Sequence, residues 1–118
     1  MVDKTTKHIL VVEDKDFERD KLVETLSAEH DKVECVSSGP QAIDLLSEYV
    51  FDVIILSLNL AAEDGLRLLS YFKSSDKTRN LPVVLLGKDE DMQKISHGLE
   101  FGAHDYVIRP IERNELKA

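Results

Sequence analysis

The chain has 118 residues, of which 42% are hydrophobic and 32% charged, and this composition is typical of one soluble globular domain rather than of a disordered segment. Fifteen Lys and Arg residues against 23 Asp and Glu residues give a net charge of −8, which disfavours binding to a nucleic-acid backbone. No apolar run approaches the ~20 residues of a membrane span, residues 1–7 hold no signal-peptide core, and the single cysteine, Cys35, fits a reducing, cytoplasmic setting.

Short apolar segments alternate with helical segments along the chain. The segments of β character are residues 8–12, 32–36, 53–56, 82–86 and 105–108. The segments 16–29, 40–49, 65–74 and 89–101 repeat apolar residues at the i, i+3 and i+4 spacing of an amphipathic helix. In the last of them, Met92, Ile95 and Leu99 are predicted to face the core. The charged run 88–91 is predicted to begin this helix, with its carboxylates complementing the helix dipole.

The alternation of strands and helices predicts βαβ units and a parallel sheet. The segments 9–12 and 53–56 are apolar on both faces, as a central strand covered by helices on each side requires. We therefore predict an α/β fold with a doubly wound, five-stranded parallel sheet.

The two ends of the chain lie outside this pattern. Residues 1–7 are predicted to be an N-terminal extension or linker, and residues 8–118 form the single domain. Residues 112–118 have the character of a fifth helix that stops after about two turns. We expect this truncated helix to come from a longer polypeptide.

In an open α/β sheet, binding sites lie outside the carboxyl ends of the strands. Here the strands are followed by a small group of polar residues and one glycine. They are Glu13, Asp14, Ser57, Asn59, Gly87 and Arg109. A site built from these residues is predicted at this edge of the sheet.

Several segments together resemble the receiver domain of bacterial response regulators, over nearly the whole chain. The matching segments are 9–14, 52–57, 64–65, 81–86, 102–106 and 109–110. The resemblance implies a flavodoxin-like (CheY-like) fold with strand order 2-1-3-4-5. It also implies a Mg²⁺ site made by the acidic pair Glu13 and Asp14 together with Asn59.

The sequence departs from this family at three site positions. Ser57 stands where receivers have the phosphoaccepting aspartate, Gly87 where they have Thr or Ser, and Arg109 where they have Lys. A serine supplies no charge and has no base to activate it, and Mg²⁺ prefers anionic oxygen ligands. We therefore expect a vestigial phosphorylation site, with Mg²⁺ bound weakly or not at all and no other cofactor. Arg109 is expected to pair with Glu13 or Asp14.

Tyr106 occupies the position of the switch aromatic in receivers. Because Gly87 has no hydroxyl group to move, we expect the usual coupling between these two positions to be lost. Tyr106 is then a half-buried aromatic with a solvated hydroxyl.

The segments 64–67, 77–83, 98–105 and 109–116 resemble one kind of receiver in particular, the second, degenerate receiver of PleD-type response regulators. This resemblance implies a non-enzymatic adaptor in cyclic di-GMP signalling, which pairs with another receiver in cis or in trans. A homodimer is expected through the face of the fourth helix, fifth strand and fifth helix. The diguanylate cyclase activity would reside in a separate GGDEF domain of the parent protein, since the 118 residues contain no GGDEF motif.

Two alternatives stay open. The chain could be a stand-alone receiver that is phosphorylated elsewhere, for instance at Glu63 or Asp64. It could instead bind a small ligand at the carboxyl edge of the sheet, although the acidic segment 13–16 replaces the Gly-rich turn that cradles phosphates.

Overall fold

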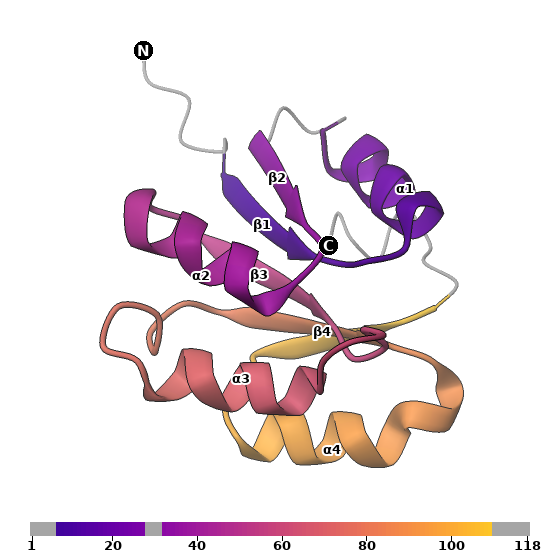
Figure 1. Cartoon of the computed structure of the whole chain (residues 1–118). Coiled ribbons are helices and arrows are strands. Elements are labelled where there is room, and N and C mark those ends of the chain that lie inside the picture. Colours follow the sequence, from indigo (N-terminus) through magenta and orange to yellow (C-terminus); the bar gives the residue numbers. More distant parts are fainter. Residues whose placement is uncertain (1–6, 28–31, 110–118) are drawn as a thin grey trace.

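The computed structural model describes residues 7–27 and 32–109, and it contains one parallel sheet with the strand order β2-β1-β3-β4-β5 (Figure 1). The strands are β1 (His8–Val12), β2 (Lys32–Val36), β3 (Val53–Ser57), β4 (Val83–Gly87) and β5 (Asp105–Ile108). The helices are α1 (Asp16–Ser27), α2 (Gly39–Glu48), α3 (Gly65–Ser74) and α4 (Met92–Glu100). The predicted flavodoxin-like fold and strand order are confirmed. The predicted fifth helix, 112–118, lies outside the described residues.

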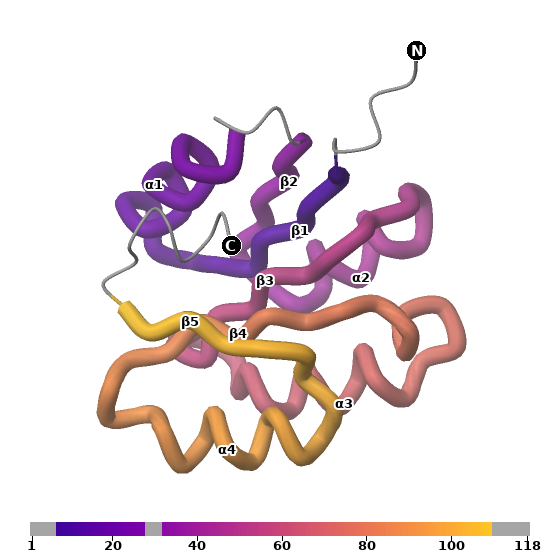
Figure 2. Tube along the Cα trace, turned by 180° about the vertical axis from the view of Figure 1, so that it is seen from behind, coloured from indigo at the N-terminus to yellow at the C-terminus, as the bar shows by residue number. Residues whose placement is uncertain are grey.

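The sheet is covered on both faces, and each face has its own apolar cluster. On one face, α2, α3 and α4 pack against side chains such as Leu10, Ile54 and Leu85, with Phe72 of α3 fully buried. On the other face, α1 packs Leu22 and Leu26 against alternate strand residues. Figure 2 shows α1 on the side of the sheet opposite α3 and α4. Burial on both faces explains the continuous apolar strands.

Helix boundaries follow local chemistry. The Ser38 side chain accepts a hydrogen bond from the Gln41 N–H at the start of α2, with Pro40 in the first turn. The Asp64 carboxylate caps α3 by accepting from the Leu66 N–H at 3.0 Å. After α4, Gly102 adopts a φ of 114°, a left-handed conformation that favours glycine.

The fourth helical segment differs from its prediction. A 3-10 turn, η1 (Asp89–Asp91), comes first, and α4 begins at Met92. Ile95 is fully buried as predicted, but Met92 and Leu99 are 43% and 38% exposed, so their assignment to the core is wrong. The reason is that α4 packs closely on β4 at Gly98, where an added Cβ would lie 2.5 Å from Leu85 Cδ1. The helix therefore buries only a narrow stripe.

The strand register brings the polar residues to one edge. Val12 pairs with Leu56, Ser57 with Leu86, and Gly87 with Ile108. The strands are parallel, so the residues at their carboxyl ends, including Glu13 and Arg109, meet at this edge. In the part of the chain that the structure describes, every helix is too short or too polar to cross a membrane.

Candidate functional site

Arg109, directly after β5, is the centre of the site. Its side chain is 6% exposed and contacts two carboxylates: Nη2 donates to Glu13 Oε1 and Nη1 donates to Glu18 Oε2. Glu13 is fully buried, and Glu18 lies in the first turn of α1. The planar guanidinium thus joins β5, β1 and α1. The expected ion pair of Arg109 with the acidic pair is found at Glu13 and not at Asp14.

Ser57, at the end of β3, is also fully buried. Its Oγ accepts hydrogen bonds from Arg109 Nη2 at 2.9 Å and from the Asn59 N–H at 3.0 Å. Both partners are donors, and neither can take a proton from the hydroxyl. The lone pairs that a nucleophile would use are therefore engaged, and a general base, which nucleophilic serines require, is not among these partners.

Asp14 points away from Glu13, toward the loop that follows β3. Asp14 Oδ2 accepts from the Ala61 N–H at 2.7 Å, and Oδ1 lies 3.2 Å from the Lys15 ammonium group. The Lys15 ammonium also donates to the backbone carbonyl of Asn59 at 2.5 Å. The Ala61 N–H, and then Lys15, lower the pKa of Asp14 below its ordinary value. The acidic pair is thus divided between two separate cations.

Asp91 lies at the start of α4, as the prediction for the run 88–91 has it, and its side chain also contacts Asn59 of the site. Asp91 is 8% exposed, and its carboxylate accepts hydrogen bonds from the Lys88 N–H at 2.8 Å and from Asn59 Nδ2 at 3.0 Å. These bonds lower its pKa. It lies over Gly87, where an added Cβ would be 3.3 Å from Asp91 Cβ and 3.1 Å from Ile95 Cδ1. Asp91 and Ile95 thus crowd the position where receivers carry a hydroxyl group.

The remaining predicted residues lie at the margin. Tyr106 on β5 is 38% exposed, and its hydroxyl has no hydrogen-bond partner among residues 7–27 and 32–109. Glu63 accepts from the Gly39 N–H at 2.7 Å, and Asp64 caps α3. Both carboxylates therefore accept hydrogen bonds from backbone N–H groups at the starts of α2 and α3. This gives no support to the alternative that Glu63 or Asp64 is the phosphoacceptor.

A divalent cation does not fit the residues in their present arrangement. Both predicted carboxylate ligands already have cationic partners, Glu13 in Arg109 and Asp14 in Lys15, and Lys15 also contacts the backbone carbonyl of Asn59. The side-chain Oδ1 of Asn59 is buried and has no hydrogen-bond partner in the part of the chain that the structure describes. The position of the third carboxylate is held by the neutral Ser57. Within the described residues, no group of three or more His, Cys, Asp or Glu side chains is placed to hold a metal. Among the described residues, Lys15, Arg109 and their carboxylate partners at this edge are engaged in ion pairs.

Three residues of the site were not predicted from the sequence to be part of it: Lys15, Glu18 and Asp91. Glu18 follows the acidic pair by one helical turn, a spacing that could have indicated a shared partner. Lys15 directly follows the acidic pair and could have been recognised as a competing cation. Asp91 had no such signal, because its burial depends on how η1 folds over Gly87.

Comparison with known proteins agrees with this fold. The family model described as "Response regulator receiver domain" matches residues 9–118. The aerobic respiration control protein ArcA of Escherichia coli is 34% identical over 111 residues, which cover 94% of this chain and 45% of ArcA. Response regulator PleD of Caulobacter vibrioides is 29% identical over 110 residues, which cover 93% of this chain and 24% of PleD. The chain thus spans less than half the length of these relatives.

A solved structure gives the same result in three dimensions. The receiver domain of the TMAO respiratory system response regulator TorR superposes with a TM-score of 0.86 and 30% sequence identity, covering 94% of this chain and 90% of that one. PleD is no more similar than ArcA, so these matches identify a family and not one regulator within it. The chain belongs to the response regulator receiver domain family of two-component signal transduction.

Proposed function

We propose that this receiver acts without phosphorylation, as an adaptor that binds other proteins. The observation that carries the proposal is the double hydrogen bond to Ser57, whose Oγ accepts from Arg109 and from the Asn59 N–H. Phosphoryl transfer needs a free nucleophile and a cation to neutralise developing charge. Here the hydroxyl oxygen is occupied, and the neighbouring cations are neutralised by carboxylates.

The face formed by α4 and β5 supports an adaptor role. Its exposed apolar side chains are Met92, Leu99, Phe101 and Tyr106, and Phe101 is 58% exposed. Exposed aromatic and methionine side chains are enriched at protein interfaces. We propose that this face pairs with another receiver, in cis, in trans or as a homodimer.

The resemblance to the adaptor receiver of PleD-type regulators supports one context for such pairing. In that context a separate GGDEF domain of the parent protein synthesises cyclic di-GMP, and the adaptor brings two chains together. The similarity to PleD over 93% of this chain is compatible with this role. The chain matches ArcA equally closely, so the similarity does not single out the PleD context. The central part of the proposal is therefore the phosphoryl-independent adaptor, and the cyclase is secondary.

Phosphorylation is tested by incubating the protein with acetyl phosphate and Mg²⁺ and measuring its intact mass. An unmodified mass is expected, while a receiver with an intact aspartate, treated in parallel, gains one phosphoryl group. A phosphoryl group on this chain would overturn the proposal.

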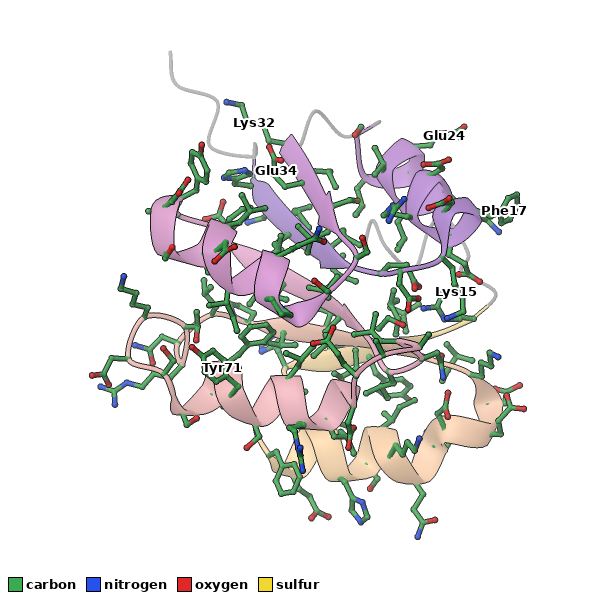
Figure 3. The ribbon with its side chains drawn as sticks, in the orientation of Figure 1. Lys15, Phe17, Glu24, Lys32, Glu34 and Tyr71 are labelled. Atoms are coloured by element: carbon green, nitrogen blue, oxygen red, sulfur yellow. The ribbon has the colours of Figure 1, made fainter. Side chains whose placement is uncertain are left out.

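Pairing is tested by sedimentation of the wild type, Phe101→Ser and Phe17→Ser. Phe17 is 79% exposed on α1, where Figure 3 shows it pointing outward, so its substitution removes the same type of side chain from another helix. Phe101→Ser is expected to weaken self-association at least tenfold, with little effect of Phe17→Ser. Equal self-association of all three proteins would contradict the α4–β5 interface.

A further inference from the structure

Lys15 connects two loops at the carboxyl edge of the sheet. Figure 3 shows this residue on the loop between β1 and α1. Its ammonium group lies 2.5 Å from the carbonyl oxygen of Asn59, on the loop after β3, and 3.2 Å from Asp14 Oδ1. The same two loops are joined again where Asp14 Oδ2 accepts from the Ala61 N–H at 2.7 Å.

These contacts coincide with the metal ligands that the receiver resemblance implies. Of the three predicted ligands, Asp14 and Asn59 face the Lys15 ammonium group, and Glu13 faces the Arg109 guanidinium. An ammonium group is a compact point charge that binds oxygen acceptors. It can therefore stand between a carboxylate and a carbonyl oxygen, as a hard cation would.

We infer that Lys15 is the resident cation of this site and takes the place of the divalent ion. The side chain of Lys15 is 46% exposed, so its contacts are screened by solvent and depend on their geometry rather than on burial. A divalent ion would have to displace the ammonium group from both oxygens. The arrangement of the two loops should therefore be independent of Mg²⁺.

The inference concerns this chain's own residues and can be tested without any phosphoryl donor. It rests on the site geometry and not on the adaptor role, so the two can fail separately. A phosphoryl group on the wild type would overturn the proposed function, whereas metal affinity of Lys15 variants decides the role of Lys15.

The first experiment uses a Ser57→Asp background, which restores the third carboxylate. Mg²⁺ affinity is measured by calorimetry for Ser57→Asp alone and in combination with Lys15→Met or Lys21→Met. Lys21 is an exposed residue of α1, so its replacement makes the same change in net charge at a different place. We expect Lys15→Met to tighten Mg²⁺ binding at least tenfold over Ser57→Asp alone, and Lys21→Met to change it less than twofold. Equal affinities, or no binding by Ser57→Asp with Lys15→Met, would overturn the inference.

A second experiment avoids the buried position altogether. The single variant Lys15→Met, a change at a half-exposed side chain, is titrated with Mn²⁺ and followed by NMR. The amide signals of Asp14 and Asn59 are expected to broaden at Mn²⁺ concentrations at least tenfold lower than in the wild type. Broadening at the same concentration in both proteins would show that Lys15 does not occupy the cation position.

Discussion

Arg109 donates a hydrogen bond to the Ser57 hydroxyl across 2.9 Å, and both side chains are buried. The receiver resemblance implies a lysine and an aspartate at these two positions. Their replacements fit each other, because the neutral hydroxyl accepts one N–H while the guanidinium directs its charge to Glu13 and Glu18. Ser57 and Arg109, with the two carboxylates, thus form one structural unit.

Removing Arg109 should destabilise the fold strongly. Arg109→Met leaves the fully buried Glu13 without a counterion, and breaking a buried pair in this way costs about 3–5 kcal/mol. Arg79→Met is the matched control, because Arg79 pairs with Asp76 on the surface and such pairs contribute about 0–1 kcal/mol. Urea denaturation measures both. Equal, small losses for the two variants would contradict the central position of Arg109.

The coupling between Arg109 and Glu13 can be isolated by a double-mutant cycle. Glu13→Gln removes the buried charge, so Arg109→Met should cost less in that background than in the wild type. The expected coupling is about 1–3 kcal/mol. Strictly additive effects on the free energy of unfolding would show that the two side chains do not depend on each other.

Restoring the family hydroxyl at Gly87 should not be tolerated well. A Cβ there would lie 3.1 Å from Ile95 Cδ1 and 3.3 Å from Asp91 Cβ, so Gly87→Ser should cost about 1–3 kcal/mol through overpacking. Gly87→Ala adds the Cβ without the hydroxyl and should lose most of the same amount. Thermal denaturation measures the loss. A Gly87→Ser protein as stable as the wild type would contradict the close packing of η1.

The fold was predictable because its signals are local. Both faces of the sheet are buried, so the central strands are continuous apolar runs, and residues such as Pro40 and Gly102 mark helix ends. The alternation of strands and helices then leaves few possible topologies. The positions of Glu13, Ser57 and Arg109 at one edge followed directly from the parallel order.

The partners inside the site were less predictable because they depend on side-chain directions. Adjacent carboxylates, Glu13 and Asp14, were expected to share one site, yet one points to Arg109 and the other to Ala61 and Lys15. The exposure of Met92 and Leu99 depends on how closely α4 approaches β4 at Gly98, and helical spacing alone does not contain this information.

Acidification should weaken the fold through Asp14 and Asp91. Both have pKa values below the ordinary value of 3.8, because backbone N–H groups bond to their charged forms. The folded state therefore binds these protons more weakly than the unfolded state. The stability they contribute is complete above the unfolded pKa and is lost as the pH falls through the lower, folded pKa.

The pH effect is measured by urea denaturation between pH 7 and about pH 2, so that the range extends below the unfolded pKa. The variant with both Asp14→Asn and Asp91→Asn should be less stable at pH 7 and should lose less further stability on acidification than the wild type. Asp20→Asn, at an exposed position of α1, serves as the control and should follow the wild type. If the stability of the double variant fell in parallel with that of the wild type, the acid sensitivity would not come from Asp14 and Asp91.

The central claim is that Lys15 and Arg109 occupy the site and exclude a metal ion and a phosphoryl group. Its most direct test is an NMR titration of the wild type with Mg²⁺ and beryllium fluoride, which mimics a phosphoryl group. The backbone amide signals of Glu13, Ser57 and Gly87 are expected to keep their positions at millimolar concentrations of both. Saturable shifts of these signals, with a new set of resonances in the loops after β1 and β3, would contradict this claim.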